Sequence, residues 1–343
     1  MLPPPVIELL VFVLSPAVIV SAADCTLTQF SQVQDVVANC TDIVVQDLTV
    51  PGGESLELDL QTGTTLTFQG QVVFNVSNWM GPLVRITGDQ LTVGGVAGHV
   101  FDGQGQLYWD GAGSSSASAK PNFLTITDAQ NSTFSGINLL NCPISCVSVV
   151  SCNEVVLDDF TVDVSEAGED VNIVGFNMTN CVNVIIKNSV FKNQGDCVVV
   201  NEGANNTFQD LVCEADDSLS FSVGFANISI SENTEADVTV EDSVILNSVN
   251  GIQVKTSQND GHGSTTNISY SNITVQGINN FGISMARNNM GQGEESIHNT
   301  LIRNPSMKSV VARMAGTSSI MDSQIICEKA GCTVTWNWGD GGD

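Results

Sequence analysis

The chain has 343 residues, of which 42% are hydrophobic and 14% charged, and this apolar share excludes a disordered chain. Acidic residues outnumber basic ones by 37 to 10, which gives a formal net charge of −27. A chain of this charge repels the phosphates of nucleic acids and of anionic membranes, so neither is expected as a partner. The length suits one large domain or two ordinary ones.

The N-terminal residues 1–23 are predicted to be a secretory signal peptide. The apolar run Leu9–Val20 is too short to span a bilayer, and the small residues Ser21 and Ala22 offer a cleavage site. The segment departs from the usual pattern because it carries Glu8 and no Lys or Arg. The alternative is a buried N-terminal strand. We expect a secreted, extracellular protein.

A repeated unit runs through the rest of the chain. Each copy holds a short alternating strand, a polar corner and a second short strand, with Val, Ile, Thr and Phe at the alternate positions. The copies begin 22 to 31 residues apart, at residues 131, 153, 182, 205, 236 and 266. A period of this length is typical of one coil of a solenoid.

The repeats predict an all-β fold, a right-handed parallel β-helix of about ten coils. Helical and leucine-rich repeats are excluded because neither the 3.6-residue spacing nor the L-x-x-L-x-L frame occurs. A β-sandwich would need hairpin signals that recur along the chain, and only Asn250-Gly251 fits such a signal, at a spacing that does not recur. We expect residues 24–343 to form one domain, with Gly111–Lys120 as a loop.

The cysteines and sequons support secretion. There are ten cysteines and no C-x-x-C zinc pattern, and three short loops suit disulfides: Cys25/Cys40, Cys197/Cys213 and Cys327/Cys332. Disulfides or an internal ladder are expected for Cys142, Cys146, Cys152 and Cys181. Eight N-x-[ST] sequons are candidate glycosylation sites: Asn39, Asn75, Asn131, Asn177, Asn205, Asn227, Asn267 and Asn272.

Several motifs together resemble one family. The stretch from Gly98-His99 through FDGQGQLYWDG to Lys120-Pro121 is similar to the DGxGxxWWDG…KP segment of the polygalacturonases of glycoside hydrolase family 28. That family's N-T-D-G-F-D, Q-D-D-C, G-H-G and R-I-K signatures correspond in order to NIVGFN, QGDC, EADDSLS and QVK, beginning at residues 172, 194, 214 and 253. Cys197 and Cys213 stand where the family has its active-site disulfide.

The resemblance implies a parallel β-helix and hydrolysis, with inversion, of the α-1,4 bonds of polygalacturonic acid. Inversion needs one carboxylic acid to protonate the leaving oxygen and one carboxylate to activate water. The family supplies these groups with the three Asp of NTD and QDD. Here the NTD position holds Val174, the first QDD position, the general acid, holds Gly195, and Asp196 is retained.

The resemblance also carries over the groups that surround the acids. The family His becomes Asp217, and the Arg that holds the substrate carboxylate becomes Gln253. Lys255 is retained as a substrate-binding residue, and Asn172 matches the Asn of NTD. The lost positive charges and the added carboxylate turn an anchor for an anionic sugar into a repelling site.

Other candidate groups have plainer interpretations. Gly261-His262-Gly263 follows Lys255, whereas the family's G-H-G precedes R-I-K, so we interpret it as a corner loop. His99 and His298 are lone histidines. The acidic residues Glu214, Asp216 and Asp217 with Asp196 offer a calcium site as an alternative, although their spacing does not show convergence. No metal and no cofactor is expected.

Two functions follow as hypotheses. The first is a catalytically inactive monomeric polygalacturonase homologue that binds a pectin-type polysaccharide or serves as a decoy for a plant inhibitor protein. The second is an active hydrolase with altered specificity for pectin or another cell-wall glycan, which would use a new carboxylate pair such as Asp196 with Asp217.

Overall fold

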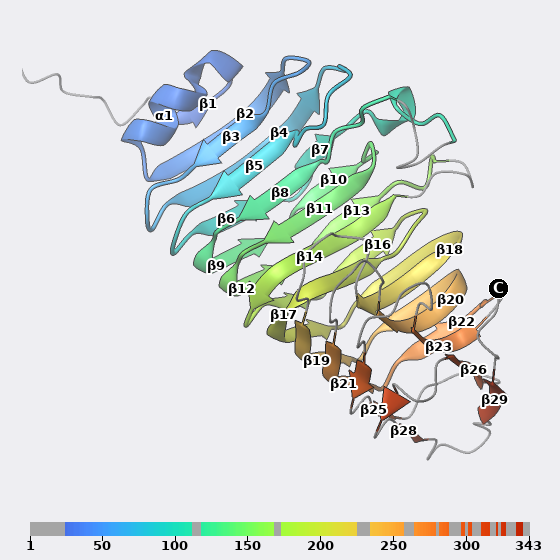
Figure 1. Cartoon of the computed structure of the whole chain (residues 1–343). Helices are drawn as coiled ribbons and strands as arrows, with labels where there is room; N and C mark the ends of the chain where they lie inside the picture. The colour runs from blue at the N-terminus through green and yellow to red at the C-terminus, as the bar shows by residue number, and fades with distance from the viewer. Residues whose placement is uncertain are drawn as a thin grey trace, which may run out of the picture.

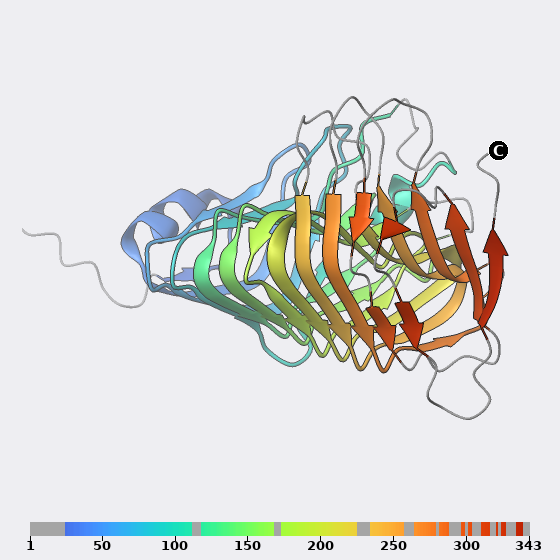
Figure 2. The same cartoon turned by 60° about the horizontal axis from the view of Figure 1, so that its bottom comes forward.

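In the computed structural model the chain winds into a solenoid of stacked coils, as predicted (Figure 1). The structure describes residues 25–111, 118–167, 173–224, 234–256, 264–278, 281–287, 296–298, 301–303, 310–315, 320–321, 324–326 and 334–338. All the strand pairings between coils are parallel, and they form three stacks of strands along the solenoid axis. Figure 2 shows the coils following one another from α1 at one end to β29 at the other. The long strands β2, β4, β14, β17, β18 and β20 bend at corners and contribute to two stacks.

The first stack carries the candidate site. Its strands pair successively from one coil to the next. They are β3 (Leu56–Asp59), β5 (Val84–Thr87), β8 (Leu124–Thr127), β11 (Ser145–Val150), β14 (Val174–Val182), β17 (Val198–Gln209), β18 (Val212–Gly224), β20 (Val244–Thr256), β23 (Phe281–Arg287), β26 (Val310–Ala315) and β29 (Val334–Trp338).

The second stack follows the first along each coil. It contains the later parts of β14 and β17 and the strands β1 (Thr26–Leu27), β2 (Asp42–Val50), β4 (Thr65–Phe74), β6 (Thr92–Gly95), β9 (Gln130–Ser135), β12 (Asn153–Asp158), β15 (Ile185–Lys187), β19 (Thr234–Glu241), β21 (Ser264–Ser271), β24 (Ser296–His298), β25 (Leu301–Arg303), β27 (Ile320–Met321) and β28 (Gln324–Ile326).

The third stack closes each coil. It contains the ends of β2 and β4, the starts of β18 and β20, and the strands β7 (Val100–Asp102), β10 (Asn138–Leu140), β13 (Thr161–Asp163), β16 (Val190–Lys192) and β22 (Thr274–Gln276). Two short 3-10 helices, η1 (Phe30–Gln32) and η2 (Gly105–Leu107), and one α-helix, α1 (Val33–Asn39), complete the described elements. None of the helices in the described part of the chain has the length and apolar content to cross a membrane.

The alternating strands build one continuous core between the stacks. Inward residues are fully buried and outward neighbours are partly exposed, as the burial pattern of Leu56–Asp59 shows. Phenylalanines of the same coil and of neighbouring coils meet edge to face inside: the Phe176 ring lies 5.6 Å from Phe160 on the preceding coil and 5.2 Å from Phe191 on its own coil. The core therefore depends on coils stacking in register, since no coil buries its inner face alone.

The corners between strands are turned by asparagine and aspartate. Asn183, Asn205 and Asp237 have φ of 57°, 56° and 56°, in the left-handed region that these two residue types tolerate best among residues with a side chain. Equivalent corners lie above one another. The Asn205 Nδ2 atom donates to Asn183 Oδ1 on the preceding coil at 2.5 Å.

Three disulfides are formed in the described part of the chain, and two of them match predicted pairs. The structure forms Cys25–Cys40 and Cys197–Cys213 as predicted, and it pairs Cys142 with Cys146. Cys152 and Cys181 are buried, unpaired neighbours on adjacent coils, so they form the internal ladder instead. The hydrogen bond with the Cys152 thiol, followed by burial, raises the pKa of Cys181, which keeps that thiol protonated. Cys327 and Cys332 lie outside the described residues.

The structure tests the predicted fold class but not the predicted signal peptide. The fold class, a right-handed parallel β-helix in one domain, is confirmed. Residues 1–24 lie outside the described residues, so the signal peptide and its boundary remain predictions, as does most of the Gly111–Lys120 loop. Helix α1 packs at the N-terminal end and buries Val33, Val36 and Val37.

His99 is a buried residue in the wall of the first coils, 1% exposed, with its ring packed against those of Phe68 and Phe101. Its Nε2 atom accepts a hydrogen bond from the backbone N–H of Asn138 at 3.2 Å, which requires that Nε2 carries no proton. Burial lowers the pKa of His99 to about 4 from its usual 6.5.

This burial predicts an acid-dependent loss of stability. Between pH 6.5 and 4 the unfolded chain binds a proton at His99 and the folded chain does not, so the free energy of unfolding falls as the pH falls through that window. The expected loss at pH 4 is about 3 kcal/mol from this residue. Chemical denaturation of the wild type and of His99→Gln, whose amide oxygen can accept the same hydrogen bond, should show a smaller loss in the variant. Equal losses in both proteins would contradict the assignment.

Candidate active site

The residues that the sequence singles out lie on four successive coils of the first stack. Val174 is the first residue of β14, and Gly195 and Asp196 occupy the turn between β16 and β17. Asp217 lies within β18, and the two remaining positions, Gln253 and Lys255, lie in β20. Asn172 and His262 lie outside the described residues.

The strand register brings Val174 and Asp196 onto adjacent coils. The backbone N–H of Gly175 donates to the Asp196 carbonyl oxygen at 2.9 Å, and Phe176 pairs with Val198. A Cβ atom on Gly175 would lie 2.5 Å from the Cys197 carbonyl oxygen, so glycine is required for this close approach. Val174, at the position where the resemblance expects the first carboxylate, therefore adjoins Asp196, and its side chain is an isopropyl group.

The Cys197–Cys213 disulfide fixes the turn from the other side. Cys197 follows Asp196 directly, and Cys213 lies near the start of β18, the strand that carries Asp217. Both cysteines are buried. The bond ties the turn that carries Asp196 to the third-stack part of β18, which pairs with β16, at the place where the resemblance expects it.

Asn193 holds the same turn through its side-chain amide and was not singled out from the sequence. Its Nδ2 atom donates to the carbonyl oxygens of Ile173 at 2.8 Å, Gly195 at 3.0 Å and Asp196 at 3.1 Å. The side chain is 2% exposed. Asn193 thus positions Gly195 and Asp196 against the segment that leads into β14. Its position directly before the Q-G-D-C motif is the sequence signal that points to it.

Asp217 lies where the ladder between β18 and β20 is interrupted. Glu214 pairs with Leu246 and Ser218 pairs with Ser248, so three residues of β18 stand opposite one residue of β20. This bulge separates Asp217 from regular pairing, which is common near functional sites. The backbone places Asp217 on the coil after that of Asp196.

The outward row beside these positions is uncharged where its side chains are described. The register aligns a row of residues on successive coils, in the order Ser148, Asn177, Val199, Ser222 and Gln253. Gln253 is 8% exposed and Val199 is 4% exposed, so both are covered by their neighbours. The Asn201 Nδ2 atom donates to Asn177 Oδ1 at 2.6 Å.

A hard-cation site receives no support from the described geometry. Among the residues that the structure describes, no group of three or more His, Cys, Asp or Glu gathers closely enough to hold a metal ion. The Glu214 carboxylate instead accepts a hydrogen bond from Asn247 Nδ2 at 3.5 Å.

The class of protein is a right-handed parallel β-helix with a candidate site on one sheet. The coils stack in parallel, the candidate residues lie on the first stack, and the Cys197–Cys213 disulfide is beside them. The profile of "Glycosyl hydrolases family 28" matches residues 40–341. The chain belongs to this family.

Individual relatives agree with the family match. A polygalacturonase of Phaedon cochleariae is 38% identical over 93% of this chain and 88% of its own length. Endopolygalacturonase I of Aspergillus niger is 35% identical over 92% of this chain and 85% of its own length. Among solved structures, endopolygalacturonase I from Stereum purpureum, complexed with two galacturonate, superimposes with a TM-score of 0.65 at 24% identity, covering 91% of this chain and 99% of that one. This last likeness supports the fold alone.

The role of Asn193 generates a stability prediction. Asn193→Ala removes the donor shared by three carbonyl groups in a buried turn, and we expect it to lower the free energy of unfolding by about 2 kcal/mol. Chemical denaturation measures this loss. Lys192→Ala is the matched control, because that side chain is exposed in the adjacent position and its loss should change stability by less than about 0.5 kcal/mol. Equal effects of the two variants would contradict the positioning role.

Proposed function

We propose that this protein is a secreted, non-catalytic member of the polygalacturonase family that binds a pectin-type polysaccharide. One observation carries the proposal. Of the three positions at which the resemblance expects catalytic carboxylates, Asp196 alone keeps one, while Val174 lies on the adjacent coil and Gly195 in the same turn. The framework supports this assignment because Gly175, Asn193 and the Cys197–Cys213 bond hold those positions together.

The chemistry explains why one carboxylate is insufficient. Inverting hydrolysis needs a proton donor and a base about 6.5–9.5 Å apart on opposite faces of the sugar. Val174 has no group that exchanges a proton, and Gly195 has no side chain. Each general acid or base contributes typically about 10² to 10⁴ in rate, although losses within one catalytic unit do not add.

The charge of the site also disfavours polygalacturonate as a substrate. Gln253 replaces a cation and Asp217 replaces a histidine, and Lys255 is the retained cation of the motif. Two like charges about 4 Å apart repel by roughly 4 kcal/mol at an effective dielectric constant near 20. The proposal therefore favours binding of a less anionic pectin-type chain. A decoy role for a plant inhibitor protein fits the same retained framework.

The alternative is an active hydrolase of altered specificity. It is favoured by the 38% identity to the Phaedon cochleariae polygalacturonase, which extends over 93% of this chain. It requires a new carboxylate pair, for which Asp196 and Asp217 on successive coils are the candidates.

Activity measurements separate the two functions. We expect the purified protein to release no reducing sugar from polygalacturonate, methylated pectin or neutral cell-wall glycans above a heat-denatured control, because the proton donor is absent. The Phaedon cochleariae polygalacturonase, assayed alongside, controls for substrate quality. Turnover of any of these substrates at ordinary enzyme rates would overturn the proposal and favour the alternative.

A gain of function tests the residue assignment itself. The combined reversions Val174→Asp, Gly195→Asp, Asp217→His and Gln253→Arg should restore measurable cleavage of polygalacturonate. Adding Asp196→Asn to the reverted protein should then abolish that cleavage. Circular dichroism verifies that each variant keeps its strand content. A folded revertant without activity would show that the framework around these positions has also lost competence.

A further inference from the structure

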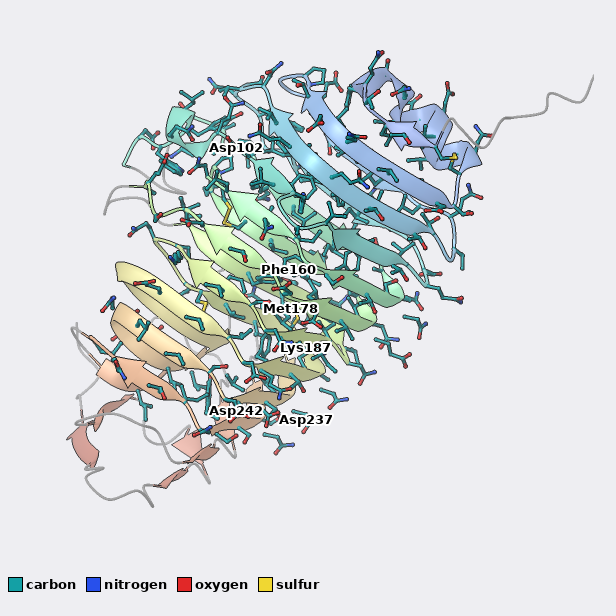
Figure 3. The ribbon with its side chains drawn as sticks, turned by 180° about the vertical axis from the view of Figure 1, so that it is seen from behind. Asp102, Phe160, Met178, Lys187, Asp237 and Asp242 are labelled. Carbon is teal, nitrogen blue, oxygen red and sulfur yellow. A yellow bond between two sulfur atoms is a disulfide. The ribbon has the colours of Figure 1, made fainter. Side chains whose placement is uncertain are left out.

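The sequons differ in where their asparagines lie on the solenoid: some are at exposed corners and one is within a strand of the first stack. Asn131, Asn205 and Asn267 are exposed and occupy one corner column, as the pairings of the flanking strands show. Asn272 is exposed at the next corner of the coil that carries Asn267. All four have φ between 49° and 56°. Asp237 and Asp242, labelled in Figure 3, occupy these same two corners on the preceding coil.

The corner position suits a bulky substituent. The corner asparagines are exposed, and a glycosylated Nδ2 atom keeps one N–H with which it can still donate to the preceding coil, as Asn205, Asn267 and Asn272 do. Glu154 and Asn183 separate Asn131 from Asn205, and Asp237 separates Asn205 from Asn267. With coils about 4.8 Å apart, the three asparagines stand about 14 and 10 Å from one another, which leaves room for an oligosaccharide on each.

Asn177 has the opposite surroundings. It lies in the middle of β14 on the candidate active-site row, between Ser148, 9% exposed, and Val199, 4% exposed. Its Oδ1 atom accepts the 2.6 Å hydrogen bond from Asn201, and the Thr179 hydroxyl, the third residue of its sequon, accepts a longer one at 3.4 Å. A sugar on Asn177 would displace these packed neighbours.

We propose that N-linked oligosaccharides are attached at Asn131, Asn205, Asn267 and Asn272, and that Asn177 is unmodified. The inference rests on the proposed secretion, which exposes the chain to a lipid-pyrophosphate oligosaccharide donor. In the transfer, the asparagine Nδ2 atom loses a proton and bonds to C1 of the first N-acetylglucosamine, and the lipid pyrophosphate leaves with that proton. The sugars then cover the corners beside the second stack and leave the candidate active-site row uncovered.

Site occupancy tests the inference directly. The full chain is expressed in a eukaryotic secretory host, and its peptides are treated with an N-glycan amidase in ¹⁸O-labelled water and analysed by mass spectrometry. We expect label at the four corner asparagines and none at Asn177. Label at Asn39 or Asn75 reports passage through the secretory pathway. If those are labelled and the corners are bare, the inference fails while the proposed secretion stands.

Matched variants assign two of the sugars without altering a corner residue. Thr207→Ala destroys the sequon of Asn205, whereas Thr207→Ser preserves it. We expect the alanine variant to lose the mass of one glycan and the serine variant to keep it. The pair Thr133→Ala and Thr133→Ser does the same for Asn131. A label at Asn177, or an unchanged mass in both alanine variants, overturns the inference. Reducing-sugar assays of the same proteins test the proposed function separately.

Discussion

Parallel register between successive coils is the constraint on which the rest of this molecule depends. Backbone N–H groups of one coil find acceptors on the neighbouring coils, as Phe176 does at Cys197, and the same register stacks Phe176 over Val198 in the core. A slip by one residue would turn the inward phenylalanines outward along a whole strand. The candidate active site exists because this register places Val174, Asp196 and Asp217 on consecutive coils although they are far apart in the sequence.

The corners make that register possible. A non-glycine residue in the left-handed region costs about 1–2 kcal/mol, and asparagine and aspartate are the usual exceptions. Here their side chains also bond to the corner of the preceding coil, as Asn267 Nδ2 does to Asp237 Oδ1 at 2.8 Å and Asn272 Nδ2 to Asp242 Oδ1 at 2.5 Å. The corner residue therefore both turns the chain and fixes the position of one coil on the next.

The sequence predicts the fold well because its signals are local and repeated. Alternating apolar residues define the strands, and the polar corners recur with each coil, so the parallel β-helix and the short-loop disulfides follow directly. Features that depend on contacts between coils are harder to predict. Cys152 and Cys181 lie beside each other on adjacent coils and remain thiols, and the Cys181 thiol donates to the Val149 carbonyl oxygen of the preceding coil. The position of Asn193 beneath the turn has the same origin, since its acceptor Ile173 lies on the preceding coil.

The residues at the site separate the requirements of the fold from those of the chemistry. Gly175, Asn193 and the Cys197–Cys213 bond have no substitute, because each fills a steric or hydrogen-bonding need of the coil itself. The carboxylates have no such role. Several carboxylates confined to adjacent coils repel one another, and that repulsion raises the free energy of the folded state. At two of the positions where the resemblance expects carboxylates stand Val174 and Gly195, and the backbone hydrogen bond from Gly175 to Asp196 is formed there. The coil forms without carboxylates at Val174 and Gly195, so the residues at these two positions are set by the chemistry of the site and not by the fold.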